Sequence, residues 1–424
     1  MSRARAAALE TFKALHNRSY RLFFLGQIVS VSGTWMQSVA QAWLVLKITN
    51  SGTSLGLVVA AQTVPVLVAG PWGGLVADRF DKRLTLLSTQ ASAAVLALVL
   101  GLLTLFGVVQ LWMIALLALG LGAVNAVDIP TRQAFVMEMV GADDLTNAVS
   151  LNSVIMNGAR VVGPSIAGVL ILLIGIAPCF LVNAASYVAV IVGLALIRPT
   201  DLRRDVPAAR QPGQLLQGLR YVWRTPVLRT PLLMMALIGT FAYEFQVTLL
   251  LLARFTFHSG SEVYGLMGSF MGAGAVVGGL WAAGQGRPTG RRLGIASVAF
   301  GALILLCAAM PDLAFEFAAL AIMGAASIVF AATANATIQL TASPEMRGRV
   351  MALYAMAFMG STPIGGPIVG WIGQVWSPRI ALAVGGLAAL AAGAAGWRSL
   401  AQFTPPRRRR EPVIPPEALI KPAG

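Results

Sequence analysis

The stretch from Gly70 to Arg83, GPWGGLVADRFDKR, decides the fold of this chain. Its first half ends an apolar run with two small residues four positions apart, Gly70 and Gly74, a spacing that lets helix backbones approach closely inside a bilayer. Its second half places five charged residues in six positions, and another long apolar run begins at Leu84. We therefore predict a short, charged hairpin between two membrane-spanning helices.

The composition also favours a membrane protein. Hydrophobic residues make up 57% of the 424 residues and charged residues only 11%, and the mean hydropathy is +0.77. A soluble protein has a much lower apolar fraction. The net charge of +15 could suggest nucleic acid, but the basic residues form short clusters between apolar runs, so we expect no nucleic-acid partner.

Twelve apolar runs reach the length of about 20 residues that crosses a bilayer. They lie at 20–46, 53–77, 84–108, 111–136, 146–173, 176–197, 230–254, 262–284, 292–310, 313–340, 346–373 and 379–401. Of the 31 Lys and Arg residues, only Lys47, Arg254 and Arg379 lie in or beside the odd-numbered loops. The positive-inside rule then places both termini on the cytoplasmic side of the cell membrane, and we expect no cleaved signal peptide.

The longest connection divides the chain into two halves of six spans. We predict an N-terminal bundle over 1–197, a cytoplasmic linker over 198–229, a C-terminal bundle over 230–402 and a cytoplasmic tail over 403–424. The halves also echo each other, because the spacing of Leu151, Gly163 and Gly168 recurs as Leu353, Gly365 and Gly370. The predicted fold class is an all-α membrane protein of two pseudo-symmetric six-helix bundles, and we expect a monomer.

The linker and the tail carry features that suit a membrane surface. Leu215, Leu216, Leu219 and Val222 form a short amphipathic segment, which is typical of an interfacial helix. The tail is rich in proline and contains the basic run 407–410, which we expect to contact anionic membrane lipid.

Polar residues inside the spans predict a wet interior. Gln27, Ser30, Thr34, Gln37 and Gln41 follow one another at steps of three or four, so they form one stripe on the first helix. In a bilayer such a stripe must face protein or water. Spans four, seven and ten also carry polar groups. The predicted substrate cavity is lined by Gln37, Gln41, Asn125, Tyr243, Glu244 and Asn335.

Three charges lie deep in the predicted spans: Asp128, Arg160 and Glu244. A charge at the centre of a membrane helix costs about 2.5–3.5 kcal/mol on insertion scales, so each needs a partner or a role. Asp128 can pair with Arg132 four residues later. Arg160 is either a member of a structural ion pair or a functional group. Glu244 has no cation in its own helix, so we predict that it couples transport to protons, with Asp128 as the alternative proton site.

The charged hairpin predicts a conformational latch. Asp78 lies at the C-terminal end of its helix, where the dipole disfavours a carboxylate. We expect it to face the start of span eleven near Pro344 and Glu345 in the outward-open state, while Lys82 or Arg83 reaches Asp128. The predicted latch residues are Gly74, Asp78, Arg79, Lys82, Arg83 and Arg132.

Signatures of enzymes are absent from the sequence. It contains no G-x-x-x-x-G-K-[ST], no H-E-x-x-H and no G-x-S-x-G, and its only histidines are His16 and His258. We expect no catalytic residues, no metal and no cofactor. For a membrane protein without these signatures, the function that remains is transport of a solute across the membrane.

The segment from Gly74 to Arg83 resembles the loop 2–3 signature of the major facilitator superfamily, with Asp81 where the general pattern has glycine. The D-R-F-D-K-R form is similar to that of the branch containing the enterobactin exporter and related efflux proteins, as are the stretches 17–27, 128–134 and 239–254. An antiporter motif of the superfamily, G-P-x-x-G-G, is matched by Gly163, Pro164 and Gly168, with Ala167 in place of one glycine.

The resemblance implies a secondary transporter that works by alternating access, with its site at the midplane between the bundles. It implies proton-coupled export of a hydrophobic small molecule of the drug or siderophore class. Two alternatives remain open from the sequence: proton-coupled uptake by symport, and a membrane sensor or accessory subunit that transports nothing.

Overall fold

The computed structural model describes residues 12–141, 143–203, 214–285, 288–343 and 345–400. These residues are almost entirely helical, and this part of the chain contains no strand. The predicted tail, with its basic run 407–410, lies outside the described residues, as does Pro344 in the predicted latch.

The long helices of the first half follow one another through short turns. They are α2 (Arg18–Thr49), α3 (Gly52–Arg79), α4 (Lys82–Leu105), α5 (Leu111–Val140), α6 (Leu145–Ile174) and α7 (Ala177–Leu196), preceded by the short helix η1 (Lys13–His16). After η2 (Pro199–Asp201) the chain continues with α8 (Gln214–Arg224), α9 (Pro226–Phe241), α10 (Phe245–Leu251), the π-helical turn η3 (Leu252–Thr256), α11 (Ser261–Gly284), α12 (Gly290–Ala309), α13 (Leu313–Thr341), α14 (Arg347–Met359), α15 (Thr362–Val375) and α16 (Pro378–Leu400).

Eleven helical segments of the described chain are long and apolar enough to cross a membrane. α2 is 32 residues long but is not one of the eleven, because polar residues such as the three glutamines of its stripe lower its hydropathy. Two of the eleven segments are interrupted helices: α9 and α10 form one, and α14 and α15 form another. The sequence predicted both of these spans as continuous helices.

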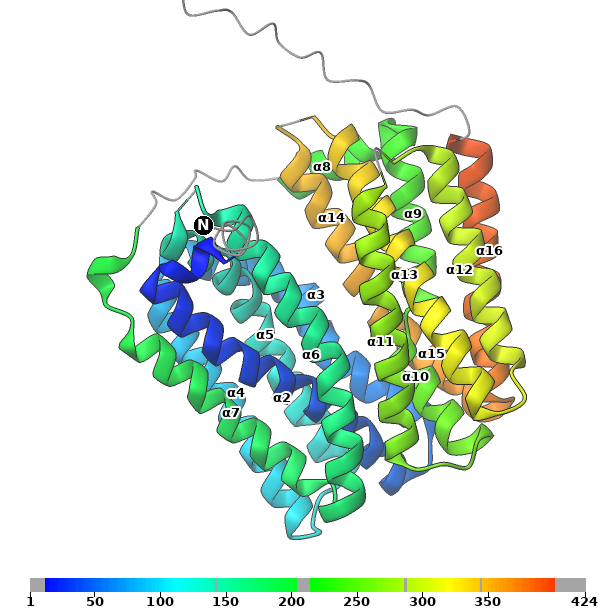
Figure 1. The fold of residues 1–424 in the computed structure, drawn as a ribbon, viewed down its shortest axis with the longest axis horizontal. Coiled ribbons are helices and arrows are strands. Elements are labelled where there is room, and N and C mark those ends of the chain that lie inside the picture. Colours follow the sequence, from blue (N-terminus) through cyan, green and yellow to red (C-terminus); the bar gives the residue numbers. More distant parts are fainter. Residues whose placement is uncertain (1–11, 142, 204–213, 286–287, 344, 401–424) are drawn as a thin grey trace, which may run out of the picture.

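Figure 1 shows the helices in two groups, with α2 to α7 on one side and α9 to α16 on the other. α3 packs against α15 and α6 packs against α11, so these four helices join the groups. We call the end at which α3, α5 and α13 finish the basic end, and the end with the turn at Asn50 the Asn50 end. The two groups diverge toward the basic end (Figure 1).

The charged hairpin has the predicted form. Only Phe80 and Asp81 separate α3 from α4. Asp81 is the N-cap of α4, and its carboxylate accepts a hydrogen bond of 3.0 Å from the backbone N–H of Leu84. This cap satisfies a donor that the first turn of a helix cannot pair internally, which explains why an acidic residue stands at the turn.

The linker also contains the predicted helix, α8. Val222 is buried, whereas Leu216 and Trp223 are exposed by 62% and 58%. The exposed apolar side chains leave α8 with a hydrophobic surface beside the basic end, as expected for a helix at a membrane interface.

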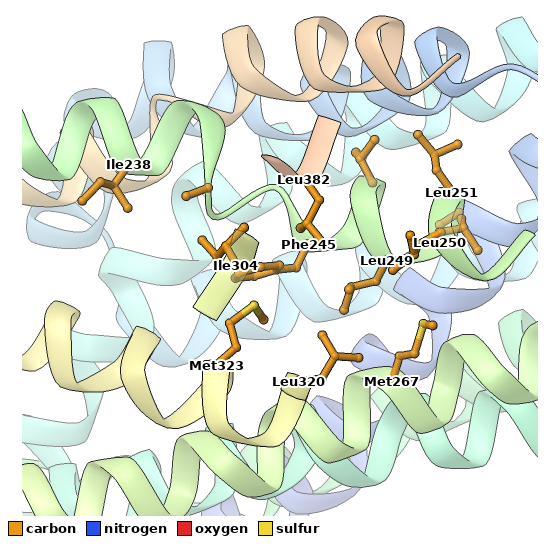
Figure 2. Packing of buried hydrophobic residues seen from close by; sticks show 14 of the residues in the cluster. Ile238, Phe245, Leu249, Leu250, Leu251, Met267, Ile304, Leu320, Met323 and Leu382 are labelled. Carbon is orange, nitrogen blue, oxygen red and sulfur yellow. The ribbon is translucent and has the colours of Figure 1, made fainter. Parts of the chain in front are cut away.

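A continuous apolar core fills the C-terminal group and centres on α9 and α10. Ile238 and Phe245, on the two sides of the helix break, are both buried, and Phe245 lies near Ile304 and Met323 from the surrounding helices (Figure 2). The broken segment is therefore held within the core and is surrounded by α12, α13 and α16.

Candidate functional site at the broken helix

The break between α9 and α10 covers Ala242, Tyr243 and Glu244. The backbone N–H of Tyr243 donates to the carbonyl of Ile238 at 3.1 Å, five residues back, so the helix widens before it ends. Glu244 then leaves helical geometry with φ −80° and ψ 40°. In many transporters the binding site is built where a membrane helix is discontinuous, because freed backbone groups and helix ends meet there.

Glu244 is buried at this break, with 3% of its surface exposed. Its Oε1 atom has no hydrogen-bond partner among the described residues, and no ion pair in that part of the chain includes it. The side chain of Thr362, the first residue of α15, interacts with the carboxyl group. The Glu244 side chain therefore lies at the N-terminal end of another helix, where the dipole favours negative charge.

The second break, at Gly360 and Ser361 between α14 and α15, lies beside the first. A methyl group on Gly239 of α9 would stand 2.5 Å from the Ser361 Oγ atom. One on Gly365 would stand 3.0 Å from Oε1 of Glu244. A methyl group on Gly365 would also overlap the carbonyl oxygen of Thr240, so glycine is required there for the two interrupted helices to come this close.

The same turn of α15 contacts the N-terminal group. A methyl group on Gly366 would stand 3.6 Å from Oε2 of Glu244 and 3.2 Å from the carbonyl oxygen of Gly56 in α3. One turn further, Gly370 lies against the backbone of Gly52. Glu244 thus lies next to the contact between α3 and α15 that joins the two groups.

Hydrogen bonds strengthen this contact at the Asn50 end. The Oε1 atom of Gln374, in the last turn of α15, accepts from Ser51 Oγ at 2.7 Å, from Thr53 Oγ1 at 3.0 Å and from the Thr53 backbone N–H at 3.1 Å. We call Gln374, Ser51 and Thr53 the Gln374 latch. This latch was not predicted, although the hydroxyl residues Ser51 and Thr53, one and three positions after Asn50, are a polar signal at a span end.

Tyr243 belongs to an aromatic cluster inside the C-terminal group. Its ring lies 5.2 Å from Phe358 and 5.4 Å from Phe300, and its hydroxyl donates to the carbonyl of Ser327 at 2.7 Å. The ring and the hydroxyl together fix the residue that precedes Glu244.

Among the other predicted cavity residues, Gln37 and Gln41 lie in contacts between helices, whereas the hydrogen bond of Asn335 lies within α13. Gln37 is buried and accepts a 2.7 Å hydrogen bond from Asn183 of α7, and Gln41 donates to Gln62 of α3 at 3.4 Å. Asn335 accepts a hydrogen bond from Gln339, and Asn125 is half-buried. The stripe of α2 therefore faces protein along much of its length, and contact of these residues with a substrate stays a prediction.

Asp128 lies in a saturated cluster and has 1% of its surface exposed. Its Oδ1 accepts from Thr89 Oγ1 at 2.8 Å and from Gln90 Nε2 at 2.7 Å, and its Oδ2 pairs with Arg132. Arg132 also donates to Gln27 of the α2 stripe at 2.7 Å. The predicted pair of Asp128 and Arg132 is present. Thr89 and Gln90 were missed, although they belong to a cluster of polar residues in the first half of α4.

In this structure Lys82 and Arg83 have other partners, and the expectation that one of them reaches Asp128 in the outward-open state stays a prediction. Lys82 instead pairs with Glu138 of α5 at 2.6 Å, and Arg83 donates to the carbonyl of Leu194 at 2.7 Å at the end of α7. A cation suits a helix C-terminus, and the opening turn of α4 brings both cations closer to these partners than to the buried aspartate. Gly74 is buried, Asp78 is half-buried and Arg79 is exposed at the end of α3, and the contact of Asp78 with Glu345 stays a prediction.

The antiporter-like motif lies where α6 meets α11. A methyl group on Gly265 of α11 would stand 2.6 Å from the carbonyl of Pro164, and one on Gly168 would stand 3.0 Å from the Cα of Glu262. Gly163 faces α2 instead, where a methyl group would stand 2.5 Å from the Cβ of Trp35. The motif thus lets α6 pack closely on both neighbours, and α6 passes Pro164 as one helix.

A shallow groove of about 630 Å³ opens between α3, α4 and α5 at the basic end. Its wall includes Thr89, which donates to Asp128, and small polar residues such as Ser88 and Ser92. The groove therefore leads toward the Asp128 cluster and not toward Glu244.

Comparison with known proteins is consistent with this architecture. Residues 9–407 match a family model described as "Transmembrane secretion effector". The multidrug efflux pump Tap of Mycolicibacterium fortuitum is 28% identical over 81% of this chain and 86% of its own length. The staphyloferrin A transporter of Staphylococcus aureus is 27% identical over 61% of this chain and 65% of its own, and the enterobactin exporter EntS of Citrobacter koseri is 24% identical over 95% and 96%.

Solved structures with the same fold are also membrane transporters. A bacterial homologue of the human lysosomal transporter Spinster, in an inward-facing and occupied conformation, superposes with a TM-score of 0.72 at 14% identity, over 91% of this chain and 97% of that one. A D-xylose–proton symporter superposes with a TM-score of 0.64 at 13% identity, over 91% and 97%. At this identity the likeness concerns the fold alone.

Proposed function

The chain belongs to the transmembrane secretion effector family of the major facilitator superfamily, and from this premise we propose that it exports a hydrophobic small molecule of the drug or siderophore class in exchange for protons. It is a multi-pass membrane transporter and not an enzyme. Similarity to a multidrug efflux pump and to two siderophore transporters supports the substrate class.

The proposed architecture has twelve spans in two six-helix bundles, with α2 as the twelfth span. Its polar stripe is compatible with a membrane because the glutamines pair with Arg132, Asn183 and Gln62. The proposed boundaries are 1–197, 198–229, 230–402 and 403–424. The positive-inside rule places the basic end in the cytoplasm of a bacterial cell, and the structure then corresponds to a carrier closed at the outer face.

Glu244 is the proposed proton carrier, and one observation supports this most: its buried carboxyl group has no cation partner and lies beside the α3–α15 contact. Loss of the proton would leave an uncompensated charge in the membrane core, while the first turn of α15 offers partial compensation of about 0.3–1 kcal/mol. Both protonation states are therefore accessible. A charge at this place also changes the packing between α3 and α15, which links protonation to alternating access.

A positively charged or hydrogen-bonding substrate would compete with the proton for the Glu244 carboxylate. In the proposed cycle, protonation from outside releases the substrate, the protonated carrier returns, and loss of the proton to the cytoplasm restores the site. Asp128 suits this role less, because Arg132, Thr89 and Gln90 already satisfy both of its oxygens. Uptake by symport would require the proton and the substrate to bind together.

A screen followed by a transport assay tests this function. The purified protein is heated with drugs such as ethidium and with the siderophores enterobactin and staphyloferrin A, and stabilising compounds are then tested in proteoliposomes with an imposed pH gradient. The proposal predicts movement of the stabilising compound opposite to the protons. Movement in the same direction as the protons would indicate symport, and transport of none of them would favour a sensor or accessory subunit.

A further inference from the structure

Arg160 lies near the middle of α6, within the membrane-spanning part of the chain. Its guanidinium carbon stands 5.0 Å from the centre of the Trp35 ring of α2. It also interacts electrostatically with Tyr243, which belongs to the break between α9 and α10. Arg160 therefore faces both groups of helices, at the level of the broken helix that holds Glu244.

No carboxylate among the described residues forms an ion pair with Arg160; the three ion pairs found there join Lys13 to Asp144, Lys82 to Glu138 and Arg132 to Asp128. A charge at this depth costs about 2.5–3.5 kcal/mol on insertion scales. A cation–π contact returns about 0.5–2 kcal/mol, so packing against Trp35 alone does not offset the cost. Helix packing would be served as well by an uncharged side chain.

We propose that Arg160 and Trp35 form a subsite for the carboxylate group of an amphipathic substrate, an inference that rests on the proposed transport function. A guanidinium offers two parallel N–H donors that match the two oxygens of a carboxylate. The Trp35 ring offers an apolar face for the ring or chain that carries the acid. Trp35 packs against the buried apolar side chains of Val31, Ile155 and Ala159, which support the ring from behind.

The subsite complements the one proposed at Glu244. The carboxylate of the substrate would bind at Arg160, and a basic or hydrogen-bonding group on the same molecule would compete with the proton at Glu244. Tyr243 relates the two subsites, since it adjoins Glu244 in the chain and interacts with Arg160. The class of substrate that suits both subsites has an acidic group, a basic or polar group and an apolar body between them.

The test uses two probes of nearly identical shape, 1-naphthaleneacetate and its neutral amide, whose binding to the purified full-length protein is measured by calorimetry. The wild type should bind the carboxylate about tenfold more tightly than the amide, which corresponds to one charge-assisted contact of about 1.4 kcal/mol. Arg160→Gln should remove this preference and keep the affinity for the amide. Arg160→Lys should retain only part of the preference, because the ammonium group lacks the planar fork.

Arg254→Gln is the matched control, because Arg254 also lies over a tryptophan, Trp43, at 5.9 Å, but is exposed at the Asn50 end. It should leave the preference unchanged. Equal binding of the two probes by the wild type, no saturable binding of either, or an undiminished preference in a folded Arg160→Gln protein would overturn the subsite. Proton-driven export with no preference for the carboxylate would reject the subsite and keep the proposed function. A preference for the carboxylate that Arg160→Gln removes, without proton-driven export, would reject the function and keep the subsite.

Discussion

Glu244 lies so close to Gly365 that a methyl group on the glycine would stand 3.0 Å from the carboxylate Oε1. The two residues come from different interrupted helices, and the next residue of α15, Gly366, contacts Gly56 of α3. A titratable group, two helix breaks and the contact between the two groups are thus neighbours. In the proposed mechanism, this arrangement connects protonation of Glu244 to the closure of the Asn50 end.

The first prediction concerns the glycine contact. Gly56→Ala would place a methyl group against the Gly366 carbonyl and within 2.7 Å of the Pro367 Cα, and such overpacking costs about 1–3 kcal/mol. We expect α3 and α15 to separate and transport to fall. Spin labels at the exposed positions Leu57 and Val375 should report a longer distance.

Gly70→Ala is the control for this change, because it lies in the same helix and a methyl group there meets nothing within 4 Å. It should keep both the label distance and the transport rate of the wild type. An unchanged distance in Gly56→Ala would show that the close approach of α3 and α15 does not hold the Asn50 end closed.

The second prediction concerns the Gln374 latch. Gln374→Leu removes the acceptor of three hydrogen bonds, and because these groups are exposed we expect a net loss of about 1 kcal/mol. The population closed at the Asn50 end should then fall about fivefold relative to the open one. The same pair of spin labels measures this shift, and no shift would show that water replaces the bonds without cost. Gln110→Leu, which loses only a local bond from Trp112 at the same end, should leave the populations unchanged.

The third prediction separates a structural role of Asp128 from proton coupling. Asp128→Asn removes the charge that neutralises Arg132 in a buried site, and breaking such a pair costs about 3 kcal/mol. The thermal unfolding midpoint should fall by several degrees, and the pH dependence of transport in the folded fraction should not change. Asp143→Asn changes an exposed aspartate between α5 and α6, and it should alter neither the unfolding midpoint nor the pH dependence of transport. A stable Asp128→Asn protein with altered pH dependence would transfer the proton role to Asp128.

Local patterns predicted much of the fold and of its polar contacts. Spacing alone identified the stripe on α2 and the pair of Asp128 and Arg132, because residues three or four apart share a helix face. The hairpin at Asp81 was predictable for the same reason, since caps and charges act within a few residues. Each of these features depends on neighbours in the sequence.

Features that depend on packing between distant segments were not predictable. No proline or glycine lies between Phe241 and Phe245, so the break at Glu244 had no local signal. It is stabilised by other helices, with Gly365 against the carbonyl of Thr240 and Gly385 against that of Phe241. The partners that Lys82 and Arg83 have in this structure were not predicted for the same reason, since their choice depends on how α4, α5 and α7 meet.

The most direct test of the account is transport by Glu244→Gln in proteoliposomes, because this change keeps the shape of the side chain and removes its titration. The substrate is the compound that the wild type moves against its gradient when a pH gradient is imposed. We predict that the variant still exchanges labelled for unlabelled substrate across the membrane, that it no longer accumulates substrate in response to the pH gradient, and that its exchange rate no longer depends on pH. Accumulation with the pH dependence of the wild type would contradict the assignment of Glu244 as the proton carrier.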